Sequence, residues 1–174
     1  MSFARVRALA IVAVLLIGAL VAVYLAMNRE PGSAQAGDGA CRPGSVPANL
    51  DLPAANTVKI NVYNATGQVG LASQVGEDFA NRNFDLQQRG DDPLGSEVEG
   101  VAVLRYGPAT VGAAHVLQAY FLNDAEPQFD IERTDDVVDV VIGVQFRQLA
   151  TETEVRQSIA ALGNPEPPPG TCSG

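Results

Sequence analysis

The chain has 174 residues, of which 47% are hydrophobic, so it can form one domain and is too apolar to be largely disordered. Its formal charge is −9, but residues 1–30 carry +2, so the remainder carries −11 and contains a single lysine, Lys59. Because contacts of Lys and Arg to phosphate supply most nucleic-acid affinity, we expect no nucleic-acid partner. One histidine and two cysteines leave few candidates for catalysis or metal binding. We therefore expect no catalytic residue, no metal and no cofactor.

A segment near the N-terminus is long enough to cross a membrane. Residues 8–27 are uncharged and rich in Leu, Val, Ile and Ala, and at about 1.5 Å per residue they span roughly 30 Å. Arg5 and Arg7 precede it, which predicts that residues 1–7 are cytoplasmic and that the C-terminal part is extracytoplasmic. A signal peptide cleaved near residues 34–36 is the alternative. We favour a retained single-pass anchor in the cytoplasmic membrane, because the apolar run is longer than that of a signal peptide.

Two cysteines, Cys41 and Cys172, lie near the two ends of the part expected outside the membrane. In an oxidising compartment such a pair indicates a disulfide, here closing a loop of about 130 residues. Loop-closure entropy gives such a bond roughly 4 to 5 kcal/mol at most. The bond would also hold the Pro-rich segment 165–169, which cannot form a helix. Intermolecular pairing and redox chemistry are the alternatives, although the chain has no CxxC motif.

The rest of the chain divides by composition into a linker, a domain and a tail. Residues 28–57 are rich in Pro and Gly and are predicted to be a linker, and residues 148–174 a short helix with a Pro-rich tail. The domain is predicted over residues 58–147. In its first half, apolar and polar residues alternate, apolar residues then recur at helical spacing, and alternation resumes after that. This pattern predicts a strand, a helix and a strand. These elements are expected over residues 58–63, 71–82 and 84–87.

The second half of the domain repeats this order. A strand over 101–106, a helix over 111–123 and strand residues near 129–131 match the first half, with Tyr63 aligned on Tyr106 and Phe79 on Phe121. The closing strand, rich in Val and Ile, is expected in the centre of the sheet over residues 137–142. Two matched halves predict an α+β fold, a βαββαβ two-layer sandwich with both helices on one face, preceded by one transmembrane helix.

Several short motifs occur in this domain in a fixed order. They are VKINVYNATG at 58–67, GLA at 70–72, NFDL at 83–86, YG at 106–107 and VVIG at 140–143. Together they resemble the LytR C-terminal domain family, in particular its actinobacterial cell envelope integrity subgroup, over about residues 58–147. The resemblance implies an envelope module without the separate transferase domain of LytR-CpsA-Psr proteins, which attaches glycopolymers to the cell wall. The two cysteines outside the domain match this subgroup better than the family at large.

The loop between the first strand and helix is the candidate ligand or partner site. It contains Asn64, Thr66, Gly67 and Gly70, and free amides at a helix start can hold an anion. No Lys or Arg lies in the loop, so we favour a plain helix entry. In that interpretation Thr66 or Gly67 caps the helix and Gly70 allows close contact between helix and sheet.

Other polar residues have mostly structural interpretations. His115 has no second histidine or reactive cysteine to pair with and is expected to be a packed or half-exposed helix residue. Tyr63 and Tyr106 either offer aromatic surface or belong to the core, and we favour the core. Several acidic residues could supply calcium ligands but lack EF-hand spacing, so solvated acidic turns are expected. These are Asp91, Asp92, Glu97, Glu99, Asp135, Asp136 and Asp139.

The sequence thus favours a membrane-anchored extracytoplasmic module that is not an enzyme. It would support cell envelope integrity by binding an envelope protein or a cell-wall polymer. A peptidoglycan glycan-binding domain like the SPOR domains, which share the βαββαβ order and single-pass anchoring, is the alternative. A hydrolase or transferase is disfavoured because the nucleophile and GxSxG patterns are missing.

Overall fold

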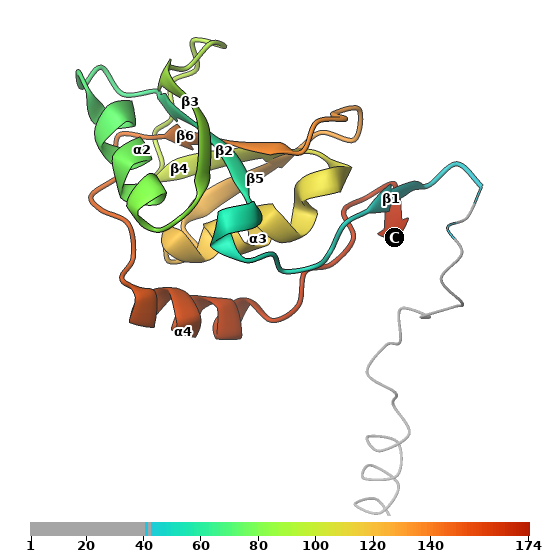
Figure 1. Ribbon diagram of the computed structural model, residues 1–174. Helices are drawn as coiled ribbons and strands as arrows, with labels where there is room; N and C mark the ends of the chain where they lie inside the picture. The colour runs from blue at the N-terminus through green and yellow to red at the C-terminus, as the bar shows by residue number, and fades with distance from the viewer. Residues whose placement is uncertain (1–40, 42) are drawn as a thin grey trace, which may run out of the picture. The chain divides into compact units, whose positions relative to one another are not determined.

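The computed structural model describes Cys41 and residues 43–174 (Figure 1). The expected membrane segment at residues 8–27 and most of the expected linker lie outside the described residues. Within the described part of the chain, no helix has the length and apolar character needed to span a bilayer.

A five-stranded sheet forms the centre of the domain, in the order β3-β2-β6-β4-β5. The first three of these strands are parallel to one another, and β4 and β5 are parallel to each other. The two groups meet where β4 pairs with β6 in the antiparallel sense. The strand bounds are Lys59–Asn64 for β2, Asp85–Asp91 for β3, Ala102–Tyr106 for β4, Ala125–Phe129 for β5 and Val137–Ile142 for β6.

Two strand-helix-strand units flank the central strand β6. Helix α2 (Leu71–Asn81) connects β2 to β3, and helix α3 (Val111–Tyr120) connects β4 to β5. The predicted α+β class is confirmed, and β6 is central as expected, but the sheet has one strand more than the βαββαβ order. The two units supply the four strands of that order, so β6 is the additional one, whereas β5 lies earlier than the expected strand residues 129–131. Pro127 obscures it in the sequence, and an edge strand tolerates this proline because its N–H side is unpaired.

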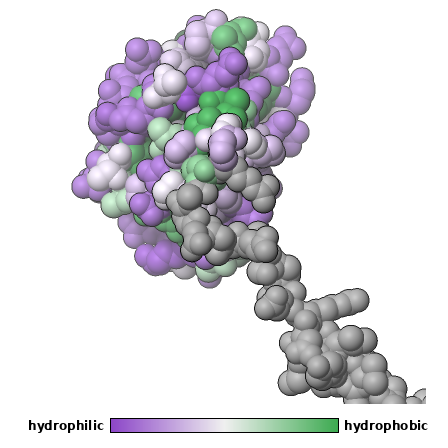
Figure 2. All heavy atoms as spheres, turned by 90° about the vertical axis from the view of Figure 1, so that its right-hand side faces the viewer, coloured by the Kyte–Doolittle hydropathy of each residue, from purple (hydrophilic) through white to green (hydrophobic). Residues whose placement is uncertain are grey.

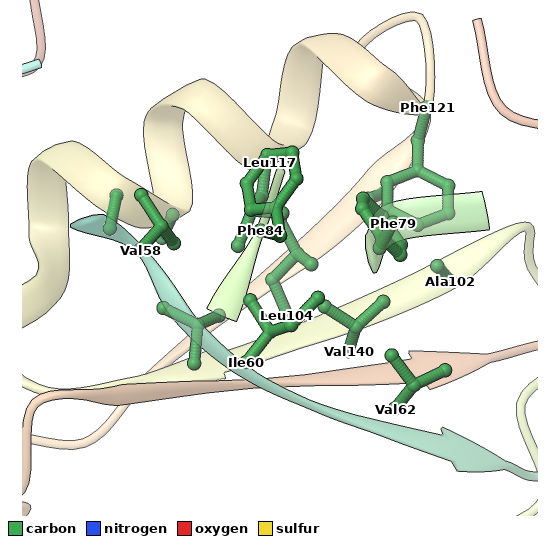
Figure 3. Close-up of a cluster of buried hydrophobic side chains, with 14 of the residues drawn as sticks. Val58, Ile60, Val62, Phe79, Phe84, Ala102, Leu104, Leu117, Phe121 and Val140 are labelled. Carbon is green, nitrogen blue, oxygen red and sulfur yellow. The ribbon is translucent and has the colours of Figure 1, made fainter. Parts of the chain in front are cut away.

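The core lies between one face of the sheet and the two helices. Side chains at alternate positions of β2 and β4, such as Ile60 and Leu104, point toward Leu117 of α3 (Figure 3). Three phenylalanine rings fill the space between α2 and the end of α3, with ring centroids 5.1 Å apart for Phe79 and Phe84 and 6.1 Å for Phe79 and Phe121. Both helices therefore share one continuous apolar core.

Helix α3 is buried on nearly all sides because a third layer covers its outer surface. Helix α4 (Glu152–Leu162) lies on α3 on the side away from the sheet (Figure 1). Its Val155 packs with Ala119 of α3 and with Ala150. Thr151 caps α4 and exchanges hydrogen bonds with Glu154, so the helix begins at a capping box.

The internal repeat is correct in element order but wrong in register. Tyr63 lies on the sheet face opposite the helices, where its hydroxyl donates to Gln88, whereas Tyr106 lies in the core on the helix face. Because side chains alternate between faces, aligning the two tyrosines shifts one strand by one residue. Gly70 and Gly112 differ too, since Gly70 precedes α2 at φ 83° and Gly112 lies within α3.

The two ends of the described chain are held together. Strand β1 (Val46–Ala48) pairs in parallel with β7 (Thr171–Ser173), and the predicted Cys41–Cys172 disulfide is present, with Cα atoms 5.5 Å apart. We call β1, β7 and this bond the terminal clasp. Residues 46–57, expected in the linker, belong to the folded domain instead. They include the 3-10 helix Ala55–Thr57, and Ala48 is buried in the core.

Gly112 is needed where the chain after β1 crosses the start of α3. Its N–H donates to Asn49 O, and a Cβ atom there would overlap the backbone carbonyl of Asp51. We expect Gly112→Ala to lower the free energy of unfolding by about 1 to 3 kcal/mol, although alanine in an open helix stabilises by about 1 kcal/mol. Urea unfolding measures this. The control is Gly67→Ala, where a Cβ meets open space, and equal stability of both variants would contradict the packing argument.

The disulfide of the terminal clasp is expected to stabilise the folded domain. Replacing both cysteines, Cys41→Ser with Cys172→Ser, should lower the free energy of unfolding by about 2 to 5 kcal/mol, because the bond closes a loop with a sequence separation of 131. Urea unfolding of the oxidised protein against the double variant gives the difference. The wild-type chain under a dithiol reductant serves as the second reference and should match the variant.

Candidate functional site

The predicted loop after β2 is closed by its own side chains. Asn64 Oδ1 accepts from the N–H of Thr66 at 3.0 Å and from its hydroxyl at 2.8 Å. Thr66 and Gly67 do not cap α2, contrary to the expectation from the sequence. Gly70 is the N-cap and makes no side-chain bond. A Cβ on Gly70 would meet nothing within 4 Å, so its positive φ requires glycine there, rather than close contact between helix and sheet.

The strongest concentration of interacting polar groups lies elsewhere, on the sheet face opposite the helices. Residues that are directly paired across the five strands form one line on this face. We call it the polar row, and it consists of Gln88, Asn61, Asp139, Arg105 and Gln128, in the order of the strands. Beside it on the same face lie Tyr63, Val141 and Val103, again paired across strands.

Arg105 and Asp92 form the most buried ion pair of this face. Two guanidinium nitrogens of Arg105 donate to the Asp92 carboxylate at 2.7 and 3.0 Å, and the side chains are 12% and 2% exposed. Arg105 also donates to Ser96 and, within the polar row, to Gln128 at 3.0 Å. The hydrogen bond from Arg105 holds the pKa of the Asp92 carboxyl at about 2, against the opposing effect of burial. Asp92 is therefore not the solvated turn residue expected from the sequence.

Asp139 occupies the middle of the polar row and has partners on two sides. One carboxylate oxygen accepts from Asn61 at 2.7 Å, and the other accepts from Arg133 at 2.8 Å. Arg133 comes from the loop before β6, and it also donates to Asp135 and to the backbone carbonyl of Arg105. Asp136 in the same loop pairs with Lys59 at 2.7 Å. Four of the acidic residues expected as solvated turns are thus ion-paired, namely Asp92, Asp135, Asp136 and Asp139, but the side chains of Asp135 and Asp136 remain 52% and 64% exposed.

His115 is half-buried in α3, which agrees with the expected packed or half-exposed helix residue. Its Nε2 hydrogen-bonds to the carbonyl of Gly163 at 3.0 Å. Both cysteines are bonded to each other, so neither is available to pair with this histidine. Among the described residues there is also no cluster of three His, Cys, Asp or Glu suited to hold a metal ion.

Large exposed hydrophobic side chains are few and come from separate segments. One side of the molecule is mostly hydrophilic with a small hydrophobic group (Figure 2). Such scattered positions are ordinary for a soluble domain, so they do not by themselves define an interface. Those exposed by more than a third in the described chain are Leu52, Val69, Leu94, Leu122, Ile131 and Val144.

Chemically, the polar row offers both hydrogen-bond donors and acceptors on hydrogen-bonded strands. Amide groups of Gln88 and Gln128 lie exposed at its two ends, and Tyr63 adds a half-buried aromatic ring beside it. The sequence suggested the alternation of β2, but the line across five strands depends on the pairing register. In the polar row, Asp139 carried a signal that could have been noticed, because it interrupts the otherwise apolar strand β6.

These features define a small α+β domain with helices on one sheet face and a disulfide clasp at its ends. The family described as "LytR cell envelope-related transcriptional attenuator" matches residues 57–146, just over half of the chain. The chain therefore belongs to the LytR C-terminal domain family, as its motifs predicted.

Two known proteins are similar to this chain. It is 26% identical to the cell envelope integrity protein Cei of Mycobacterium tuberculosis, with 89% of this chain and 79% of that protein covered. It also resembles the crystal structure of the soluble domain of a conserved hypothetical secreted protein from Mycobacterium marinum. That likeness has a TM-score of 0.53 at 25% identity and covers 70% of this chain and 82% of the other.

The ion pair of Asp92 predicts an acid sensitivity. A folded-state pKa of about 2, below the ordinary 3.8, stabilises the protein above about pH 4, and this contribution of about 2 kcal/mol is lost as the pH falls toward 2. Urea unfolding between pH 7 and pH 2 measures it. Asp92→Asn should be less stable at pH 7 by a similar amount and should lack this part of the pH dependence. If the free energy of unfolding of Asp92→Asn fell with pH as steeply as that of the wild type, other carboxyl groups would be the cause of the acid sensitivity.

Proposed function

We propose that this chain is a membrane-anchored, extracytoplasmic, non-catalytic module that supports cell envelope integrity by binding an envelope protein or a wall polymer. The polar row and Tyr63 would form the contact surface. The single observation that carries this choice of surface is the side-by-side pairing of five polar residues across the whole sheet, on the face without helices.

The similar proteins support the location. One is called a cell envelope integrity protein and the other is described as secreted. The Cys41–Cys172 disulfide agrees with an oxidising compartment, since such bonds persist mainly outside the cytoplasm. The uncharged residues 8–27 support a retained anchor by their length.

The arrangement of the polar row supports binding over catalysis. Arg105 and Arg133 are engaged with Asp92, Asp135 and Asp139, so both guanidinium groups are paired and their positions are fixed. Side chains held in this way lose little conformational entropy when a partner binds. A fixed surface with no aligned nucleophile and base is suited to recognition.

A glycan partner is the second candidate, and the composition of the polar row favours it specifically. The exposed amide groups of Gln88 and Gln128, with the Tyr63 ring between them, can exchange several hydrogen bonds with the hydroxyl groups of a sugar chain. The acidic remainder of the protein would repel a strongly anionic polymer, which favours neutral glycan over charged polymer. Retention of the purified chain on isolated wall glycan at low salt tests this candidate, and absence of retention removes it.

Crosslinking in cells tests the contact surface. A photo-crosslinking residue placed at Gln88 or Gln128, at the two ends of the polar row, should capture a partner that is then identified. The matched control is Gln157, an exposed glutamine on α4, which lies away from the sheet. We expect adducts from the first two positions and none from the third. Equal adducts from all three, or adducts from Gln157 alone, would exclude the polar row as the contact surface.

A further inference from the structure

The two edges of the five-stranded sheet differ in how open they are to a further strand. At one edge, β5 carries Pro127, which has no N–H to donate, next to the exposed Glu126. At the other edge, β3 contains no proline, and it is the only one of the five strands without a fully buried residue. The β5 edge is thus protected by proline, whereas the β3 edge is accessible to a pairing strand.

Backbone groups of β3 point away from the sheet at two positions in its second half. The N–H of Asp92, directly after the strand, donates to the Asn64 carbonyl of β2. Because successive N–H groups of a strand point in opposite directions, those of Arg89 and Asp91 point away from β2. A β-bulge lies earlier in the strand, but residues 88–91 pair with β2 without a shift. In the described chain, neither outward residue makes a backbone hydrogen bond outside the sheet, so their N–H and carbonyl groups are free to pair.

The side chains along β3 indicate the charge of a matching strand. Asp85 and Asp91, at the two ends of β3, are exposed, and neither forms an ion pair within the described residues. Arg89 is the only cation of the strand, and it is already paired with Glu77 of α2 at 3.4 Å. The edge therefore has a surplus of two carboxylates, which favours a partner segment with basic side chains.

We propose that the β3 edge is the docking site of an extended, basic segment of an envelope protein, which adds to the sheet as a further strand. Its backbone pairs with the outward groups of Arg89 and Asp91, and main-chain pairing of this kind supplies affinity while side chains supply specificity. The polar row ends at this edge with Gln88, so an added strand places one of its own side chains next to Gln88 and continues the row. The inference rests on the proposed function, because it names a protein segment as the partner and one end of the polar row as its place of binding.

Crosslinking in cells, combined with substitutions that close the edge, tests this proposal. A photo-crosslinking residue replaces Gln87, which is exposed in β3 and lies outside the polar row. Arg89→Pro removes one outward N–H, whereas its matched control, Arg89→Ala, loses the same ion pair with Glu77 and keeps the N–H. Because this N–H takes no part in the pairing with β2, an edge strand tolerates proline there, and urea unfolding checks that both variants are folded.

A second pair of variants closes the edge at its other outward N–H. Asp91→Pro removes this N–H, and Asp91→Ala is its control, since it loses the same carboxylate and keeps the N–H. This pair keeps the test decisive where Arg89→Pro fails to fold. The yield of adduct is measured by immunoblotting of the full chain, and mass spectrometry of the crosslinked peptide identifies the captured segment.

We expect position 87 to capture a segment that contains Lys or Arg, with a yield about fivefold lower in each proline variant than in its alanine control, as for the loss of one backbone hydrogen bond. Equal yields in a folded proline variant and its control would overturn the proposal, and so would a captured segment that is acidic or belongs to a second copy of this chain. If positions 88 and 128 capture a partner and position 87 does not, strand addition is wrong while the proposed contact surface stands. Absence of adducts from all three positions would overturn both.

Discussion

The antiparallel pairing of β4 with β6 is the constraint on which the rest of this structure depends. It turns the second strand-helix-strand unit by half a rotation relative to the first, while each unit keeps the same handed crossover. As a consequence α2 and α3 cover the same sheet face and share one core around Phe79 and Leu117. The opposite face receives no helix, and it must be made compatible with water by its own side chains.

That uncovered face is made compatible with water by pairing its charges. Arg105 and Asp139 are covered by partners from the loops before β4 and β6 and are 12% and 17% exposed, so an unpaired charge there would be poorly hydrated. Pairing them across strands keeps them ordered, and the resulting polar row is both a structural device and a fixed surface. A partner that binds there meets groups already held in position, which is the physical basis of the proposed recognition.

The two ends of the domain are joined by the terminal clasp. The terminal clasp holds the segment around Ala48 against the start of α3, where Gly112 leaves room for it. One covalent bond thus fixes both the entry of the chain into the domain and its C-terminal strand β7. The helix α4 between them completes the burial of α3, which explains why that helix is apolar on nearly every side.

The sequence by itself determined the family, the α+β class, the disulfide and the central position of the strand 137–142, because motifs, composition and apolar runs are local signals. It placed the strand containing Pro127 too late, near residues 129–131, since an edge position that tolerates proline is a property of the sheet. It placed Tyr63 and Tyr106 in equivalent positions, since a shift of one residue reverses the face and is invisible without the pairing. The burial of Asp92 and the polar row were decided by the tertiary structure alone, because their partners are brought together by strand register and not by spacing along the chain.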